Sequence, residues 1–282
     1  MMIDLHMHSA ASDGSQTAAE IIRECQRAQL QLNAITDHDN IDAQEEAAQE
    51  SARLGRPYLT GVEISVKHTG ELHILGYGMD IQQPAFRQMM EDLRKSRVER
   101  IRYILQALAE HGIDIRTEDV EAQAAGNTLG RPHVALALVA RGFAASYREA
   151  FTKYLNEGGL CYVQRRKLNA REAIELIRAA GGLPVAAHPG LITTDDLEGL
   201  ISELRRDGLG GIEAFYPAHS DEDVRRYCQL AGRLGLVVTC GSDSHGAYRD
   251  AAIGGEKRSS EQLESDVEKV LMPLALSRMD NQ

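Results

Sequence analysis

Short apolar segments alternate with helical segments along most of this chain, and this alternation limits the folds that the chain can adopt. Residues 3–8 ("IDLHMH") and 33–38 ("NAITDH") have the pattern of strands, and residues 17–30 between them have the spacing of a helix. The next predicted elements are a helix over residues 42–55 and strands over 58–66 and 70–78. A strand–helix–strand order implies parallel pairing. The sequence therefore predicts an α/β architecture.

The alternation stops near residue 83 and resumes near residue 172. Between these points apolar residues recur at helical spacing from Met90 to Leu108, interrupted by Arg97, and shorter helices are predicted over 117–126 and 131–142. We therefore predict a mostly helical insertion, residues 84–171, within one domain made of residues 1–83 and 172–282. About seven strands, each followed by a helix, predict a barrel-like α/β fold, with a doubly wound open sheet as the alternative.

Composition narrows the classes of function. The chain has 282 residues, of which 43% are hydrophobic, so it can bury a core. A net charge of −11 disfavours a broad basic face for long nucleic acids, although it does not exclude a small anionic substrate. The four cysteines lack CxxC spacing, and neither a signal peptide nor a membrane-spanning stretch is evident. We expect a cytoplasmic protein, without a membrane or protein partner.

Histidines and carboxylates occur where the predicted strands end. His6 and His8 are two residues apart, so they point to the same side of an extended strand. Other residues share this position: His38, Glu63, His73, His188, Glu213, Asp243 and His245. One such residue alone is more often structural, or a helix cap. In a parallel barrel, however, all these strand ends meet at one mouth, where active sites are built.

A metal site explains why so many of these groups would converge. Six imidazoles and several carboxylates without cations would be costly to bury and would repel one another. Imidazole with carboxylate suits zinc, manganese or iron, and the lack of cysteine at these positions disfavours a structural zinc site. The set exceeds the needs of one ion and fits two or three. The pattern therefore predicts a multinuclear metal site.

Six motifs occur in a characteristic order: "DLHMHSAASDG", "ITDHD", "GVEIS", "LHILGYG", "AHPG" and "GSDSHG". In this order they resemble those of the polymerase and histidinol phosphatase (PHP) family, which is related to the amidohydrolase superfamily. The resemblance extends from residue 4 to residue 246. It implies a distorted (β/α)7 TIM-like barrel with a cluster of two or three divalent ions, with Mn²⁺ expected and Fe²⁺ or Zn²⁺ as alternatives.

The resemblance also implies which residues bind these ions. The nine implied ligands, grouped by ion, are His6, His8, Glu63 and Asp243, then His73 and His188 with Glu63 bridging, then Asp13, His38 and His245. Asp243, Glu63 and His188 would hold the ions that carry the attacking hydroxide. We predict that Asp37 either orients a ligand imidazole or serves as an ordinary turn residue. Glu213 is left open as a supporting or a structural residue.

Two segments of the insertion narrow the resemblance. "GRPHVALAL" and "YVQRRKL" resemble a subgroup of 3′,5′-nucleoside bisphosphate phosphatases and 5′-to-3′ exonucleases that act on short RNA. We expect hydrolysis of the 3′-phosphate of such a bisphosphate, with exonuclease activity on short 5′-phosphorylated RNA or DNA as the alternative. The residues predicted to bind the substrate, with exposed surface as their alternative role, are Arg131, His133, Arg165, Arg166 and Lys167.

Other functions fit the sequence less well than these two. Histidinol phosphate hydrolysis fits less well, because the insertion resembles a different subgroup. A non-catalytic metal-dependent module would be expected to have lost ligands, and metal storage does not suit scattered ligands of mixed type. Tyr216 is predicted to contact a base or sugar, or to pack in the core. The shape of the insertion decides between the two leading activities, because a closed pocket favours mononucleotides and an open groove favours chains.

Overall fold

Seven short strands follow one another around a barrel in the computed structural model, which describes residues 1–126 and 128–279. They are β1 (Ile3–Asp4), β2 (Leu32–Asn33), β3 (Gly61–Ser65), β4 (His73–Tyr77), β5 (Leu183–Ala186), β6 (Gly211–Phe215) and β7 (Val237–Cys240). β1 pairs with β2, and β3 to β7 form a second sheet in sequence order. Backbone bridges between His38 and Glu63 and between Met7 and Ser244 join the two sheets at both edges.

One strand runs against the predicted direction. β4 is antiparallel to both β3 and β5, whereas β1–β2, β5–β6 and β6–β7 are parallel. The expectation of parallel pairing throughout is therefore wrong for β4, because only a short turn connects it to β3. This reversal places His73 at the start of β4 opposite Ser65 at the end of β3. His73 thus reaches the same mouth as the residues at the strand ends.

The first two strands and the last are shorter than expected, yet their pairing continues towards the mouth. His8 N donates to the Ser244 carbonyl and Thr36 N to that of Met7, both at 2.8 Å. The backbone is not extended at Asp243, whose φ of 53° lies in the left-handed region. Asp243 and His245 therefore reach the site from a turn and not from an extended strand.

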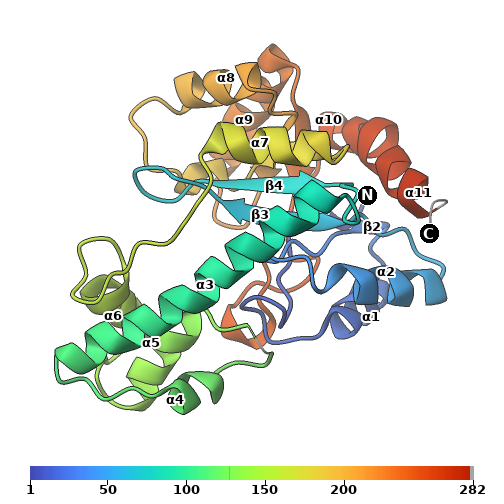
Figure 1. Cartoon of the computed structure of the whole chain (residues 1–282). Coiled ribbons are helices and arrows are strands. Elements are labelled where there is room, and N and C mark those ends of the chain that lie inside the picture. Colours follow the sequence, from blue (N-terminus) through green and yellow to red (C-terminus); the bar gives the residue numbers. More distant parts are fainter. Residues whose placement is uncertain (127, 280–282) are drawn as a thin grey trace.

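Helices cover the outside of the barrel (Figure 1). They are α1 (Ala18–Arg27), α2 (Gln44–Arg53), α7 (Ala170–Ala179), α8 (Leu197–Arg206), α9 (Asp221–Leu234), α10 (Glu261–Asp266) and α11 (Met272–Met279). Shorter helical turns are η2 (Pro189–Leu191), η3 (Gly246–Tyr248) and η4 (Val267–Leu271). α1 begins with a capping box between Thr17 and Glu20 and buries its apolar face, which includes Ile21 and Ile22.

The segment predicted as an insertion is helical and is dominated by one long helix. Its elements are α3 (Pro84–Glu110), α4 (Thr117–Glu121), α5 (Arg131–Ala140), α6 (Tyr147–Ala150) and η1 (Phe151–Leu155). The first half of α3 packs Phe86 and Met90 into the barrel core, and its second half packs Ile104 and Leu108 into a separate core with α5. Figure 1 shows α3 leading away from the strands towards α4, α5 and α6. The division into two domain parts stays a prediction.

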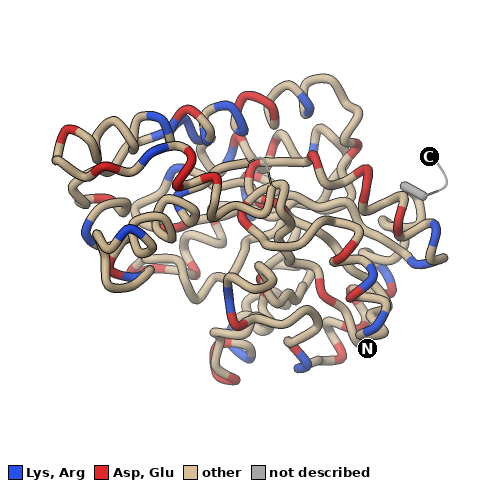
Figure 2. Tube along the Cα trace, turned by 90° about the horizontal axis from the view of Figure 1, so that it is seen from below, with Lys and Arg blue, Asp and Glu red and all other residues tan. Residues whose placement is uncertain are grey.

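Charge and hydropathy of the folded chain agree with its composition. Within residues 1–126 and 128–279, no helix combines the length and the apolar character needed to cross a membrane. Acidic and basic positions are interspersed along the trace (Figure 2), in keeping with the net charge of −11. A cluster of basic side chains lies inside the molecule, next to the mouth of the barrel.

Candidate metal centre

The structure brings all nine predicted ligands together at the mouth of the barrel. Their ligand atoms form overlapping groups in which the atoms lie within 4.8 Å of one another. These groups are His8, Asp13, His38 and His245; His6, His8 and Asp243; His6, Glu63 and His188; and His38, Glu63 and His73. Glu63 lies within β3 and His73 begins β4, whereas the other seven side chains come from the loops that follow β1, β2, β5 and β7.

Glu63 lies at the centre of this cluster. Its Oε1 is 2.7 Å from His73 Nδ1 and 3.0 Å from His188 Nε2. Its Oε2 faces other histidines, 2.8 Å from His38 Nδ1 and 3.4 Å from His8 Nε2. Ligands of one ion bound at about 2.0–2.2 Å lie roughly 3 Å apart, so these spacings are those of ligands that share ions. Because its two oxygens face different histidines, Glu63 has the geometry of a bridging carboxylate.

Several buried atoms of the cluster make no hydrogen bond of good geometry with the described residues, although some lie within ion-pair distance of one another. They are His6 Nε2, both ring nitrogens of His8, His38 Nδ1, Glu63 Oε2, His188 Nδ1 and His245 Nε2. Buried polar atoms are rarely left unpaired in this way. Divalent cations would satisfy imidazole nitrogens and carboxylate oxygens together. The donor set therefore fits a metal centre with more than one ion.

The pKa values of two members of the cluster, Glu63 and His8, favour the forms that bind cations. Burial alone would raise the pKa of Glu63, but the neighbouring histidines, His38 and His73 foremost, hold it well below its usual range. Burial, together with His245 and His38, lowers the pKa of His8 to about 3. The Glu63 carboxyl is therefore ionised and the His8 imidazole neutral at physiological pH, which are the forms that bind metal.

Glu213, which the sequence left open, supports two of the histidines. Its Oε1 lies 2.9 Å from His6 Nδ1, and its Oε2 accepts a hydrogen bond from His188 N at 2.8 Å. With His6 Nδ1 engaged, its Nε2 is directed at Glu63 and Asp243. Glu213 thus orients one imidazole and fixes the backbone that carries another, as acidic neighbours of ligand histidines commonly do.

Asp243 has its two oxygens in different surroundings. Oδ1 is 3.1 Å from His8 Nε2, on the side of the cluster. Oδ2 accepts hydrogen bonds from Tyr216 Oη at 2.9 Å and from Arg249 Nη1 at 2.7 Å. Tyr216 is therefore not simple core packing, and its contact with a base or sugar stays a prediction. Together with Arg249, which sequence reasoning missed, it holds the carboxylate so that one oxygen stays available to an ion.

Asp37 fits the second of the two roles predicted for it, that of a residue that holds a turn. It accepts hydrogen bonds from Ser9 N at 2.8 Å and from the hydroxyl groups of Ser9 and Ser12. Within the described residues it makes no hydrogen bond with an imidazole, since the loop after β1 folds over its carboxylate. Burial raises its pKa to about 6. Asp37 therefore holds the loop that carries Asp13, and does not orient a ligand histidine.

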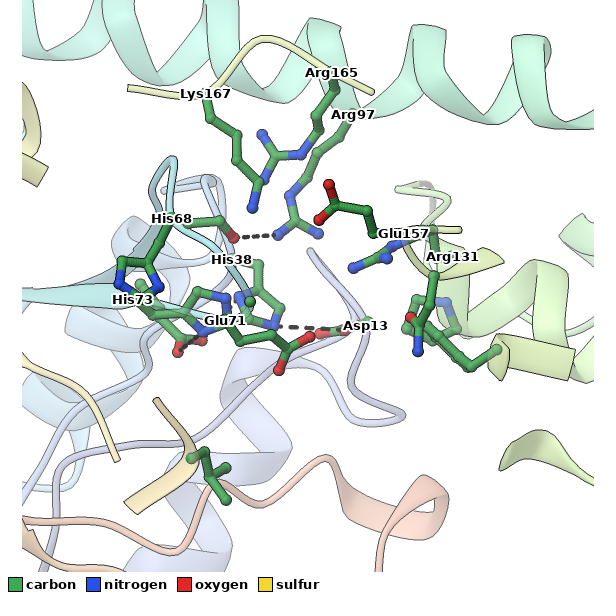
Figure 3. A pocket seen from close by; sticks show the side chains of 18 of the residues that line it. Asp13, His38, His68, Glu71, His73, Arg97, Arg131, Glu157, Arg165 and Lys167 are labelled. Atoms are coloured by element: carbon green, nitrogen blue, oxygen red, sulfur yellow. Dashed lines mark hydrogen bonds and ion pairs between the residues drawn. The ribbon is translucent and has the colours of Figure 1, made fainter. Parts of the chain in front are cut away.

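A cavity of about 570 Å³ opens onto the metal-ligand cluster, and cationic side chains line its opposite wall. Figure 3 shows Arg97, Arg165 and Lys167 pointing down towards His38 and His73, with Arg131 at the side. We call this set the cationic wall: Arg97, Arg100, Arg131, Arg165 and Lys167. Arg131, Arg165 and Lys167 were predicted, whereas Arg97 and Arg100 were missed. The interruption of the apolar pattern of α3 at Arg97 was the signal that could have found it.

Two predicted substrate-binding residues lie outside this cavity lining. His133 is buried, and its Nδ1 accepts a hydrogen bond from Gly130 N at 3.0 Å, so it caps the start of its own helix α5. Arg166 is exposed, with its Nη1 3.7 Å from Asp92 Oδ2. It points away because Arg165 and Lys167, on either side of it, turn inwards. We therefore leave both residues out of the proposed binding set.

The cationic wall carries more positive charge than its acidic neighbours neutralise. Asp39 accepts hydrogen bonds from Arg97 and Arg165, but Arg100 has no acidic partner among the described residues and lies over the Tyr162 ring, 5.4 Å from its centre. Burial, together with nearby Arg131 and Arg165, lowers the pKa of Arg100 to about 9. An anion bound in the cavity would relieve this excess of charge.

Comparisons with known proteins agree with this geometry. The family model of the PHP domain matches residues 4–157. A 3′,5′-nucleoside bisphosphate phosphatase of Chromobacterium violaceum is 37% identical over 250 residues, which cover 86% of this chain and 87% of that protein. The chain belongs to the PHP domain family. The family inferred from the six motifs is confirmed.

Further relatives of this PHP protein have related names. A phosphoribosyl 1,2-cyclic phosphate 1,2-diphosphodiesterase of Eggerthella lenta is 33% identical, and the match covers 88% of this chain and 95% of that protein. The 5′-3′ exoribonuclease Rnm of Salmonella typhimurium is 32% identical, and the match covers 87% of this chain and 85% of that protein. The structure of an amidohydrolase from Chromobacterium violaceum, with bound sulfate and no metal, superimposes with a TM-score of 0.84 at 33% identity, covering 94% of this chain and 97% of that one. The predicted fold class is thereby confirmed.

Backbone strain is concentrated at this site of the PHP protein. Of the four described non-glycine residues with positive φ, three lie at the mouth: Asp39 (49°), His188 (24°) and Asp243 (53°). Such conformations cost free energy and persist where the surrounding structure enforces them. Here Glu213 holds His188 N, and Asp243 N donates to the His6 carbonyl at 2.8 Å. These backbone conformations therefore lower the stability of the fold, and they direct these groups into the mouth.

Proposed function

We propose that this PHP protein is a metal-dependent phosphoesterase that removes the 3′-phosphate from nucleoside 3′,5′-bisphosphates, converting adenosine 3′,5′-bisphosphate to AMP and phosphate. The observation that carries the proposal is one cavity with a cation-binding wall opposite an anion-binding wall. A bisphosphate has two anionic groups, so one can react at the metals while the other is held by the cationic wall. The 37% identity with a phosphatase of this specificity supports the assignment.

The nine clustered residues would hold two or three divalent cations, with Mn²⁺ as our expectation. Bound there, such ions would activate water as the nucleophile and neutralise charge on the phosphoryl oxygens. Glu63 spans neighbouring ligand groups, and Glu213 keeps His6 in the orientation needed for binding. Tyr216 and Arg249 restrain Asp243 from the other side. These contacts fix the ligands before an ion or a substrate arrives.

The wall contributed by the insertion suits a nucleoside 5′-phosphate. Arg97, Arg100 and Arg131 present guanidinium groups, which recognise phosphate oxygens through several hydrogen bonds. Tyr147 and Phe151 line the same cavity, with ring centres 4.9 Å apart. Exposed ring faces beside guanidinium groups bind bases by stacking with little preference for sequence. We therefore expect tolerance for the base and a requirement for the 5′-phosphate.

On one side α3 and residues 164–167 cover the mouth of the cavity, which favours mononucleotides over chains. Outside the cavity lining, the insertion also contacts the barrel where Tyr248 Oη donates to the Gln123 carbonyl at 3.0 Å. Exonuclease activity on short 5′-phosphorylated oligonucleotides is the second candidate, favoured by the 32% identity with Rnm. Four free cysteines and a nucleotide substrate fit the reducing cytoplasm.

The proposal is tested by phosphate release from purified protein loaded with Mn²⁺. The substrates compared are adenosine 3′,5′-bisphosphate, 3′-AMP, 5′-AMP, histidinol phosphate, phosphoribosyl 1,2-cyclic phosphate and a 5′-phosphorylated trinucleotide. We expect the highest kcat/KM for the bisphosphate. Equal turnover of 3′-AMP would contradict a need for the 5′-phosphate, and preference for the trinucleotide would favour the exonuclease. Elemental analysis of the same sample establishes how many ions are bound.

A further inference from the structure

We propose that Asp39 is a positioning residue that sets the distance between the metal centre and the site of the second phosphate. This inference rests on the proposed function, because it concerns how the non-reacting phosphate is held. Asp39 is buried and directly follows the ligand His38. It does not face the clustered ligands with its carboxylate, which extends instead to the cationic wall.

The backbone around Asp39 is fixed to the metal centre. Asp39 N donates to the Glu63 carbonyl at 2.8 Å, and Glu63 N donates to the Asp37 carbonyl at 3.2 Å. The carboxylate is fixed in turn, since its Oδ1 accepts a hydrogen bond from Ser65 N at 3.0 Å. Asp39 therefore has a defined position relative to two ligands, His38 before it and Glu63 beside it.

The other carboxylate oxygen holds two arginines of the opposite wall. Asp39 Oδ2 accepts from Arg97 Nε at 2.7 Å and from Arg165 Nη2. Arg97 also donates from Nη2 to Ser65 Oγ at 3.1 Å, which leaves its Nη1 for the cavity. The two arginines come from α3 and from the segment after η1, whose backbones are joined where Arg166 N donates to Ser96 Oγ at 3.1 Å. Asp39 is the acidic group that both guanidinium groups share. One barrel carboxylate thus locates both guanidinium groups relative to the metals.

The two phosphates of a nucleoside bisphosphate are separated by a nearly fixed distance, so this arrangement has a functional consequence. A site with mobile arginines would bind a second anion at various distances from the metals, whereas an anchored pair selects substrates whose phosphates match its spacing. A purely structural ion pair would behave differently, because its loss would impair all substrates equally. The comparison of substrates with and without a 5′-phosphate separates these two roles.

The test is the variant Asp39→Asn. Asparagine tolerates the positive φ of 49° and can still accept from Ser65 N, while the charge that holds Arg97 and Arg165 is removed. We expect the ratio of kcat/KM for adenosine 3′,5′-bisphosphate over 3′-AMP to fall at least tenfold, mainly through KM for the bisphosphate. In calorimetry with the Mn²⁺-loaded enzyme, the Kd of 5′-AMP should rise by a similar factor.

The chain offers a matched control in Glu50→Gln. Glu50 also binds two arginines, Arg23 Nε at 2.6 Å and Arg53 Nε at 2.7 Å, but on the helices α1 and α2 outside the cavity. We expect this variant to change thermal stability without changing the ratio of the two kcat/KM values. If Asp39→Asn does not fold, Arg97→Gln breaks the same ion pair from α3, and the same fall in the ratio is expected.

The outcomes separate this inference from the proposed function. If the wild-type enzyme turns over 3′-AMP as well as the bisphosphate, the proposed function is wrong whatever Asp39 does. If the wild-type enzyme prefers the bisphosphate but Asp39→Asn lowers both kcat/KM values by the same factor, the positioning role is overturned and the proposed function stands. An unchanged Kd for 5′-AMP in that variant would overturn it as well.

Discussion

The barrel side of the cavity gathers nine histidine and carboxylate side chains, several with ligand atoms that make no hydrogen bond, whereas the insertion side gathers five cationic side chains. Asp39 binds two of these cations and Glu71 and Glu157 line the same cavity, so three carboxylates face five cations. The barrel side needs bound cations to satisfy its ligand atoms, and the insertion side needs a bound anion to balance its positive charge. Neither wall alone would bind a nucleoside bisphosphate well. Together they place the two requirements at opposite ends of one substrate, so the charge pattern of the cavity mirrors that of the ligand.

The two walls also differ in how they are held. The ligands on the barrel wall sit at strand ends whose backbones are hydrogen-bonded around the ring. The cationic wall lies on α3 and on residues 164–167, and Asp39 links its side chains to the barrel beside the backbone bridge between Val66 and Leu168. Changes on the barrel wall should therefore abolish the chemical step, while changes on the cationic wall should alter substrate affinity and choice.

The largest effect is expected from Glu63→Gln on the barrel wall. An amide cannot bridge ions as a carboxylate does, and its NH₂ group would oppose the histidines that face Oε1 or Oε2. Metal ions contribute several kcal/mol to the stabilisation of the transition state, so kcat should fall about 10³-fold or more. Steady-state kinetics and elemental analysis check this, with exposed Glu175→Gln as the control. Full metal content with near-normal kcat would contradict the assignment.

A smaller effect is expected from Glu213→Gln, which keeps the shape but removes the charge beside His6. Loss of such a partner typically costs 10–100-fold in metal affinity or activity. We expect weaker Mn²⁺ binding, with much of the activity recovered at high Mn²⁺ concentration. A Mn²⁺ titration followed by activity and by calorimetry measures both. If Mn²⁺ affinity were unchanged, Glu213 would be only a structural acceptor for His188 N.

The same contrast explains what sequence could and could not predict. Most ligands of the barrel wall lie at or after the ends of short strands, so their place in the chain order predicts that they reach the mouth, whereas Asp13 was implied only by the family resemblance. The reversal of β4 did not affect this prediction. In a reversed strand the first residue lies at the mouth, and His73 is the first residue of β4. Arg97 and Arg100 lie within the 27-residue helix α3, and only the packing of α3 on two cores determines which of its faces borders the cavity. Nothing local signals that Asp39 joins them.

On the cationic wall, Arg100→Met should lower affinity while raising stability. The guanidinium is only 7% exposed and lacks an acidic partner in the described part of the chain. A buried unpaired charge is costly, so methionine should raise the Tm in phosphate-free buffer by about 2–4 °C, equivalent to roughly 1 kcal/mol. Loss of a charged hydrogen bond should weaken 5′-AMP binding about tenfold. A lower Tm with unchanged affinity would show a structural role instead.

Lys167 should give the cationic wall a measurable pH dependence. Burial, followed by Arg165 and Arg131, lowers the pKa of Lys167 to about 8, below its ordinary value of about 10.4. An anion needs the protonated form, so kcat/KM for the bisphosphate should fall several-fold as the pH rises through about 8. Because the charged form is disfavoured in the folded state, stability should rise between about pH 8 and pH 10.4.

The variant Lys167→Met tests both statements. Its kcat/KM should be lower than that of the wild type at pH 7 and should lack the decline near pH 8. The difference between the two stability curves should likewise disappear above about pH 10.4, where the lysine is neutral in both states. An identical decline near pH 8 in the variant would assign the titration to another group, such as metal-activated water.

The smallest effect is expected from Arg166→Met, within the same run of basic residues. The Arg166 side chain is 60% exposed and lies 3.7 Å from the half-buried Asp92, a kind of ion pair that contributes little to stability. Arg165 on one side is 3% exposed and bound to Asp39. We expect Arg166→Met to change KM less than twofold and Arg165→Met to raise it at least tenfold.

Similar losses in both would mean that a diffuse basic charge attracts the substrate, and a titration with salt would then weaken binding in both variants alike. A difference confined to Arg165 would show that the direction of each side chain, and not the local density of charge, makes the cationic wall.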